Sequence, residues 1–317
     1  MISNLGSLGH WVVGLDLGGT FVKGVLVDPA GQVRGEVQRN TPVADGPTQV
    51  ARAVVQAIQD LKDQAPAGVS PDAVGLASPG AIDVRNGIVV DASNLGLKNV
   101  PLVRLVQEQC GLPVFLDHDV RTAAFGELVL GSAVGLGHVF FLTLGTGIGG
   151  AVIMNGRIYT GSHELAGEIG HMVLDPEGDL CACGKRGCLE TYASASWVVR
   201  RVRELGGFGP ELDGERVATL VEQGDPVATA VWQRAASALG LALANYTVLF
   251  DPDRIILGGG LSEAGELLLE PVRQAMRRHL DPCYSVSLTR GALGAAAGRL
   301  GAAVMAQRRL TADAVSA

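Results

Sequence analysis

Residues Trp11 to Val27 read WVVGLDLGGTFVKGVLV, which is an apolar run, a glycine turn and a second apolar run. This pattern predicts a strand, a tight turn and a second strand. Residues Val139 to Met154, VFFLTLGTGIGGAVIM, repeat the layout. A duplicated hairpin with helices between the copies predicts two related α/β domains that face a cleft.

The rest of the chain alternates helical and strand patterns around these hairpins. Apolar spacing predicts helices, and short apolar runs predict strands. The helices expected are 49–62, 121–130, 194–205, 226–249 and 291–307, and the further strands are 33–40, 73–77, 114–116 and 254–257. We place a smaller domain at 1–119, with a C-terminal helix of about 300–317 folding back onto it, and a larger domain at 120–299.

Composition narrows the class of protein. Apolar residues make up 47% of 317 and aromatic residues 4%, which suits an α/β fold with cores of Val, Leu, Ile and Ala. The net charge of −7 without a basic stripe argues against a nucleic-acid partner. Five cysteines, three of them clustered, do not resemble a disulfide framework.

Two segments were considered as a signal peptide or a membrane span. Met1 to His10 has no basic region followed by an apolar run, so we expect no signal peptide. The uncharged stretch 131–156 is long enough for a membrane span, but eight glycines interrupt it. We therefore expect two buried strands there, no membrane association and a cytoplasmic protein.

Three glycine turns follow apolar strands and are candidate phosphate sites. They are Gly18-Gly19-Thr20, Gly145-Thr146-Gly147 and Gly258-Gly259-Gly260. Successive backbone N–H groups in such a turn bind anions, and glycine lets the anion approach closely. Asp16 precedes the first turn, where its carboxylate is placed to reach Mg²⁺, and Thr20 adds a hydroxyl. We also assign Lys23, on the following strand, to the nucleotide.

Each turn alone is also typical of an ordinary hairpin. The prediction of a nucleotide site depends on the presence of three such turns, each after an apolar strand. No Walker A pattern is present, which excludes the P-loop mode. Residues 145–150 match G-x-G-x-x-G, but a dinucleotide site needs a helix next. Ala151 to Met154 is strand-like, so we treat this match as a false positive.

A second constellation predicts a metal site. Cys181, Cys183 and Cys188 form a C-x-C-x4-C pattern ten residues after His171. One imidazole and three thiolates close a tetrahedral Zn²⁺ site with no open position, so its role would be structural. The alternative is unrelated buried thiols, but the Gly, Lys and Arg between the cysteines do not suit a core strand.

Four polar residues are candidates for binding vicinal hydroxyls of a polyol. They are Asn94, Asp119, Glu168 and Glu190. Asp119 follows an apolar strand, and open α/β sheets bind ligands at the carboxyl ends of strands. Glu168 and Glu190 flank the predicted zinc loop, which would bring them together and brace them. The alternative for any one of them is a solvated surface charge.

Taken together, these motifs resemble the ROK family of bacterial sugar kinases and repressors, over about residues 11–303. The matching segments are DLGGT at 16–20, SPG at 78–80, NL at 94–95, AAFGE at 123–127, LGTGIGG at 144–150, GEIGH at 167–171, CACGKRGCLE at 181–190 and LGGGLS at 257–262. The chain is most similar to the glucokinases of the family.

The resemblance implies an actin-like, ribonuclease-H-like fold of two α/β domains with ATP in the cleft. It implies Asp119 as general base for transfer of a phosphoryl group to the 6-hydroxyl of glucose. It also implies sugar contacts, which are Gly80, Asn94, Asp119, Glu168, His171 and Glu190. His118 stands where the family commonly has an amide that touches the sugar, and we assign it to the sugar too.

Several alternatives remain open from sequence. N-acetylglucosamine, mannose or fructose could replace glucose, and polyphosphate could replace ATP. The family also contains repressors, but about ten residues before the first strand are too few for a helix-turn-helix domain. A dehydrogenase would require that the G-x-G-x-x-G match at 145–150 binds a dinucleotide. We expect a homodimer or homotetramer, as is common in the family.

Overall fold

The computed structural model describes residues 9–316, so most of Met1 to His10, where no signal peptide is expected, lies outside the described residues. The chain forms two compact units. The first unit contains residues up to Gly131 and the C-terminal segment from Ala296, and the second contains Ser132–Ala295. The division falls later than residue 119, because helix α3 (Asp119–Leu130) packs on helix α9 (Ala297–Ser316) within the first unit.

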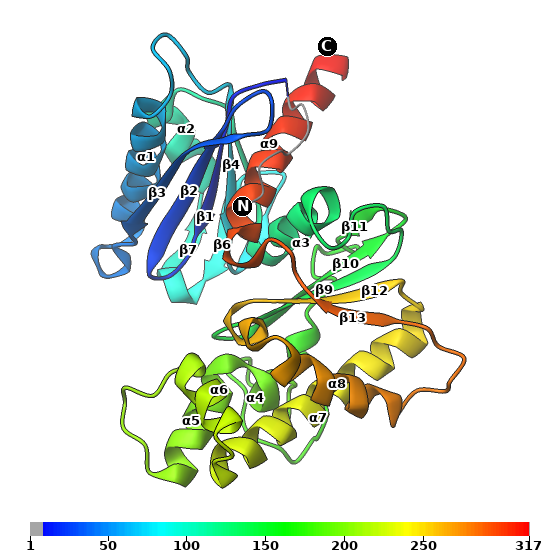
Figure 1. The fold of residues 1–317 in the computed structure, drawn as a ribbon. Helices are drawn as coiled ribbons and strands as arrows, with labels where there is room; N and C mark the ends of the chain where they lie inside the picture. Colours follow the sequence, from blue (N-terminus) through cyan, green and yellow to red (C-terminus); the bar gives the residue numbers. More distant parts are fainter. Residues whose placement is uncertain (1–8, 317) are drawn as a thin grey trace. The chain divides into compact units, whose positions relative to one another are not determined.

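The first unit is built on a five-stranded sheet in the order β3-β2-β1-β4-β8 (Figure 1). Its strands are β1 (Val12–Leu17), β2 (Phe21–Val27), β3 (Val33–Asn40), β4 (Ala73–Ser78) and β8 (Val114–His118). The first three are antiparallel neighbours, whereas β4 and β8 run parallel to β1. The carboxyl ends of β1, β4 and β8 therefore meet at one edge of the sheet.

Helices cover both faces of this sheet. On one face α1 (Pro47–Asp63) packs its apolar stripe against β2 and β3, and α2 (Leu102–Cys110) packs near β8. On the other face α9 crosses β1 and β4 (Figure 1). The backbone of α9 lies close to the sheet because two glycines, Gly14 of β1 and Gly75 of β4, face it. A Cβ added at Gly14 would lie 2.1 Å from Arg299 O, and one added at Gly75 would lie 1.9 Å from Ala302 O. Side chains at either glycine would push the helix away.

A small three-stranded sheet completes the first unit, and it was not predicted from the sequence pattern. Its strands are β5 (Ala81–Asp83), β6 (Ile88–Ala92) and β7 (Leu97–Val100). The 3₁₀ turn Ser93–Leu95 joins the last two. This sheet holds Asn94 in a defined position within the first unit.

The second unit repeats the strand pattern of the first. Its sheet has the order β11-β10-β9-β12-β13, with strands β9 (Val139–Leu144), β10 (Ile148–Met154), β11 (Arg157–Tyr159), β12 (Arg254–Gly258) and β13 (Ser287–Arg290). Three antiparallel strands are again followed by two parallel ones. This repeat confirms the duplication predicted from the two glycine hairpins, and residues 131–156 contribute two sheet strands.

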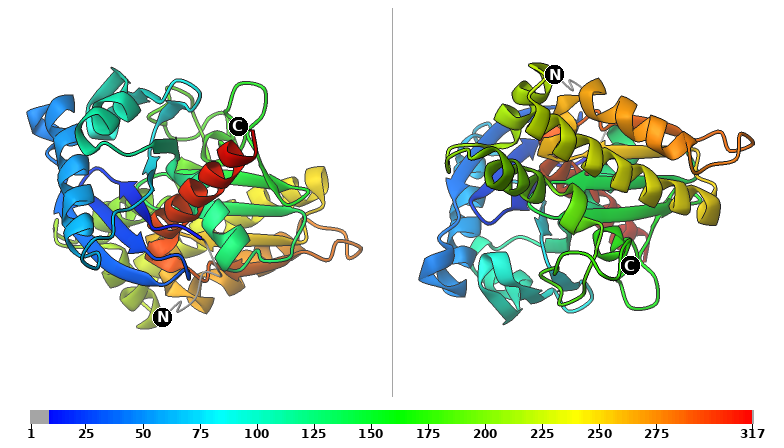
Figure 2. Two further views of the ribbon diagram at one scale, coloured as in Figure 1. Left: turned by 90° about the horizontal axis from the view of Figure 1, so that it is seen from above. Right: turned by 90° about the horizontal axis from the view of Figure 1, so that it is seen from below.

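Helices of the second unit bury a separate core. They are α4 (Glu190–Ala193), α5 (Ala195–Gly206), α6 (Gly214–Glu222), α7 (Pro226–Phe250) and α8 (Glu266–Arg277). Figure 2 shows α7 and α8 along one face of the sheet. Among residues 9–316, α7 has the length and hydropathy of a membrane span, yet 56% of its apolar window is buried inside the unit. It packs against the other four helices as a core helix.

The cysteines make no disulfide bond. Cys110 is half-buried and Cys283 is exposed, and both lie outside the segment that contains the other three cysteines.

Candidate active site

In the first unit, the predicted residues gather at the carboxyl edge of the sheet. Strand register aligns Asp16 with Ala77 of β4, and Ala77 with Asp117 of β8. Asp119 begins the next helix, two residues further on. Asp16 and Asp119 are therefore brought to the same edge by the order β1-β4-β8.

Asp16 is an enclosed carboxyl group. Burial raises the pKa of Asp16 to about 6, and the negative charge of Asp119 adds to the shift, whereas Lys23 and Arg299 oppose it. A cation beside Asp16 would remove the penalty on its ionised form. The donor chemistry of this position therefore fits Mg²⁺, a hard cation that takes oxygen ligands.

The first glycine turn lies against Asn94. A Cβ at Gly19 would be 3.1 Å from the Asn94 carbonyl oxygen, so the turn and the 3₁₀ segment are neighbours. Gly18 N–H donates to Phe21 O at 2.9 Å, and Thr20 O accepts from Thr41 N–H at 2.8 Å. These bonds fix the turn while Gly19 and Thr20 stay exposed.

Gly80 closes the turn after β4 with a φ of +93°, a left-handed conformation. A Cβ there would lie 2.1 Å from Asp91 O of the small sheet. Only glycine fits without displacing that strand. Gly80 thus lets the small sheet pack close to the strand end that precedes it.

In the second unit, the two remaining glycine turns are next to each other. Gly145 to Gly147 joins β9 to β10, and Gly258 pairs with Thr143 at the end of β12. The strand after Gly147 begins at Ile148, which confirms that the G-x-G-x-x-G match is not a dinucleotide site. Gly259 O accepts from Ser262 Oγ at 2.7 Å, which orders the turn 258–260.

Three cysteines and one histidine form a cluster beside these turns. The ligand atoms of His171, Cys181, Cys183 and Cys188 all lie within 4.8 Å of one another. Cys183 Sγ is 3.6 Å from Cys188 Sγ, and Cys181 Sγ is 3.7 Å from His171 Nδ1. Tetrahedral zinc with its usual bond lengths would space such atoms about 3.6–3.8 Å apart. The cluster therefore fits Zn²⁺.

The backbone around the cluster is tightly folded. Cys181 N–H bonds Lys185 O at 2.8 Å, and Leu189 N–H bonds Met172 O at 2.9 Å. Burial raises the pKa of the Cys188 thiol to about 12. A bound cation would stabilise the thiolate that burial alone disfavours.

Glu190 connects the cluster to the glycine turn. Its Oε2 accepts from Ile148 N–H at 2.9 Å, and a Cβ at Gly147 would lie 2.3 Å from the same oxygen. Its Oε1 lies 3.8 Å from Cys181 Sγ. The other flanking carboxylate, Glu168, lies near enough to Tyr246 of α7 that burial first and then the charge of Glu168 raise the pKa of that tyrosine.

Sequence reasoning missed three contacts within the first unit. Gly298, on α9, lies against Asp16, since a Cβ there would be 2.5 Å from Asp16 Oδ2. Arg299 follows it and bonds Glu36 at 3.3 Å. In addition, Arg121 bonds Asp117 beside the candidate base. The one signal in the sequence was Arg299, a single arginine within the Gly/Ala-rich segment 291–307.

A cavity of about 630 Å³ lies elsewhere in the second unit, between α8 and β13. None of the predicted sugar, nucleotide or metal residues lines it. We therefore keep the candidate site on the strand ends and glycine turns.

Two copies of a five-stranded α/β unit, each opening with a glycine hairpin, define the actin-like ATPase fold. The ROK family pattern matches residues 12–309, and the chain belongs to the ROK family. A glucokinase of Thermotoga maritima is 36% identical over 94% of this chain and 98% of its own length.

Solved structures agree with this classification. A ROK family glucokinase from Streptomyces griseus, in complex with glucose and AMPPNP, superposes with a TM-score of 0.83 at 32% identity, covering 94% of this chain and 99% of its own. A ROK hexokinase from Thermus thermophilus gives 0.80 at 35% identity, covering 95% and 99%. The chain is thus similar to sugar kinases over nearly its whole length.

Proposed function

We propose that the protein transfers the γ-phosphoryl group of ATP to the 6-hydroxyl of glucose. The observation that carries this proposal is the Asp119 carboxylate at the same sheet edge as Asp16, in a chain similar throughout to glucokinases. Phosphoryl transfer needs little covalent help from the protein, so positioning and charge supply most of the rate.

The residues divide into three roles. Asp119 accepts the proton of the attacking hydroxyl. Backbone N–H groups of the three glycine turns, with Thr20, Thr146 and Lys23, bind the nucleotide. The sugar contacts are assigned to Gly80, Asn94, Glu168, His171 and Glu190. Mg²⁺ near Asp16 would offset the charge that develops on the phosphates.

Zinc is proposed to act only as a brace. His171 would give Nδ1 to the metal, which leaves its other ring nitrogen for the sugar. Because Glu190 bonds Ile148 beside the turn, the metal loop would hold one sugar ligand and one phosphate turn together. Homo-oligomerisation and a cytoplasmic location also belong to the proposal.

A coupled kinase assay tests the function directly. We expect the highest kcat/KM for glucose among glucose, mannose, fructose, galactose and N-acetylglucosamine, with ATP preferred to polyphosphate. Asp119→Asn should still bind glucose but lose about 10²–10⁴-fold in kcat. Near-normal turnover of Asp119→Asn would contradict the assignment of the base, and activity on none of the hexoses would contradict the function.

A further inference from the structure

The junction between β8 and α3 places an imidazole beside the candidate base. His118 Nδ1 lies 3.4 Å from Asp119 Oδ1, and the two side chains are 17% and 34% exposed. The same oxygen accepts from Val120 N–H at 2.7 Å. Among the side chains that the structure describes, none forms a hydrogen bond or ion pair with Asp119 Oδ2. One carboxylate oxygen is therefore held, and the other is open.

The backbone of His118 is itself fixed on both sides. Its N–H donates to Asp117 Oδ1 at 2.7 Å, and its carbonyl oxygen accepts from Thr122 Oγ1 at 2.9 Å. Asp117 is in turn held by Arg121 at 2.6 Å. These bonds fix the backbone from which the imidazole reaches Asp119, and the ring itself is largely buried.

The two arginines near this junction have partners of their own. Arg121 pairs with Asp117, and Arg299 bonds Glu36. Lys23 and Arg299 act electrostatically on Asp16. Among the described side chains, the imidazole of His118 is the cationic or donor group that directly faces the Asp119 carboxylate.

We propose that His118 is a positioning residue that acts through Asp119 rather than through the sugar; this rests on the proposed kinase function. In the structure the ring is in ion-pair contact with Oδ1 at 3.4 Å. In the reacting complex the ring, with hydrogen on Nδ1, would close this gap as a donor to Oδ1 and leave Oδ2 for the reacting hydroxyl. That hydroxyl loses its proton to Oδ2 as its oxygen bonds the γ-phosphorus, and the bond from phosphorus to ADP breaks. His118 keeps its proton throughout.

The test separates kcat from KM. His118→Phe keeps an aromatic ring without a donor, and we expect kcat to fall about 10- to 100-fold while the glucose KM changes less than about threefold. His118→Asn places an amide nitrogen where Nδ1 stood and should restore most of kcat. His279→Phe, an exposed histidine on the second unit, is the matched control and should behave as wild type.

A double variant tests whether the effect passes through the base. In the Asp119→Asn background, His118→Phe should cause no further loss of turnover. Full additivity, a raised KM with unchanged kcat, or no effect of His118→Phe would each overturn the proposal. If wild type phosphorylates no hexose, the proposed function fails instead. If His118→Phe does not fold by thermal melting, His118→Leu and His118→Asn are compared in its place.

Discussion

At the scale of single residues, Asp16 is held in an unfavourable environment for a charge. Its pKa is about 6 in the folded protein because of burial and then the charge of Asp119, compared with 3.8 for an ordinary aspartate. Between these values the folded state binds more protons than the unfolded state. Folding stability therefore falls as pH rises from about 4 to about 6, and the loss stays in force at higher pH.

Asp16→Asn should remove that penalty. We expect the variant to be more stable than wild type by about 1–3 kcal/mol at pH 8, with the difference shrinking toward zero near pH 4. Urea unfolding of both proteins without added magnesium measures this. An equal gain at both pH values would show that ionisation of Asp16 is not the cause.

Two glycines in one turn offer a matched pair. A Cβ at Gly147 would lie 2.3 Å from Glu190 Oε2, whereas a Cβ at Gly145 meets nothing within 4 Å. We expect Gly147→Ala to displace Glu190 and cost about 1–3 kcal/mol of stability, while Gly145→Ala stays within about 0.5 kcal/mol. Thermal melting gives the comparison, and similar melting temperatures for both variants would contradict it.

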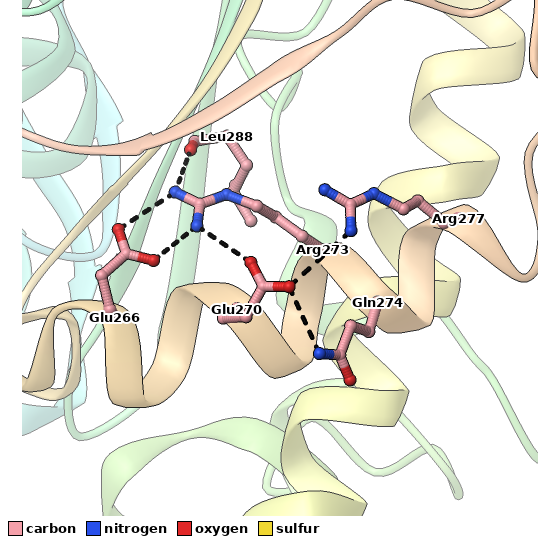
Figure 3. Close-up of polar contacts among 6 residues, drawn as sticks. All are labelled: Glu266, Glu270, Arg273, Gln274, Arg277 and Leu288. Atoms are coloured by element: carbon pink, nitrogen blue, oxygen red, sulfur yellow. Dashed lines mark hydrogen bonds and ion pairs between the residues drawn. The ribbon is translucent and has the colours of Figure 1, made fainter.

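At the scale of elements, Arg273 ties α8 to the edge of the second sheet (Figure 3). Its guanidinium bonds Glu266 at 2.5 Å and the Leu288 carbonyl of β13 at 3.0 Å, and it is only 25% exposed. Arg277, one turn later, is 69% exposed and has a 3.7 Å contact with Glu270. The two arginines therefore differ in context rather than in chemistry.

Arg273→Gln should destabilise the protein by about 1–2 kcal/mol because it leaves the Leu288 carbonyl and Glu266 without their donor. Arg277→Gln should change stability by less than about 0.5 kcal/mol, as expected for an exposed ion pair. Denaturant titration of both variants checks the difference. Equal losses would mean that surface charge, not the link to β13, matters here.

How far the sequence predicts an element depends on how local its determinants are. The hairpins at Gly18 and Gly145 and the helix at 47–63 follow from local spacing, and the structure has them within a few residues. The sequence predicts a helix from residue 291, but α9 begins at Ala297. A run of Gly and Ala has no apolar periodicity, so it does not indicate where the helix begins. The short strands of the small sheet, with exposed Asp91 and Lys98, showed no clear alternation.

The same limit applies to the candidate site. Three of the four candidate zinc ligands, Cys181, Cys183 and Cys188, share one short segment, so their spacing alone predicted that they lie together. The approach of Gly298 to Asp16 joins opposite ends of the chain and has no local signature. The bond from Glu190 to Ile148 likewise depends on how the cysteine loop packs on β10.

At the scale of the whole molecule, each unit has its own hydrophobic core, and the Cys/His cluster belongs to the second. Trp197 and Trp232 are buried in the second core, whereas Trp11 packs at the edge of the first. Trp197 Nε1 also donates to Asp179 in the metal loop at 3.4 Å. Tryptophan fluorescence can therefore report on the two units separately.

Metal removal should accordingly affect one unit first. We expect one zinc per chain by elemental analysis, lost in Cys188→Ser and kept in Cys283→Ser, whose exposed thiol lies outside the cluster. Chelation should lower the thermal transition followed by Trp197 and raise the glucose KM, because Glu190 and His171 lose their brace.

In a Trp197→Phe, Trp232→Phe variant, the emission of Trp11 should not change on chelation. A zinc-free protein with an unchanged KM would separate the metal from the sugar site, and a change in Trp11 emission would show that zinc also stabilises the first unit.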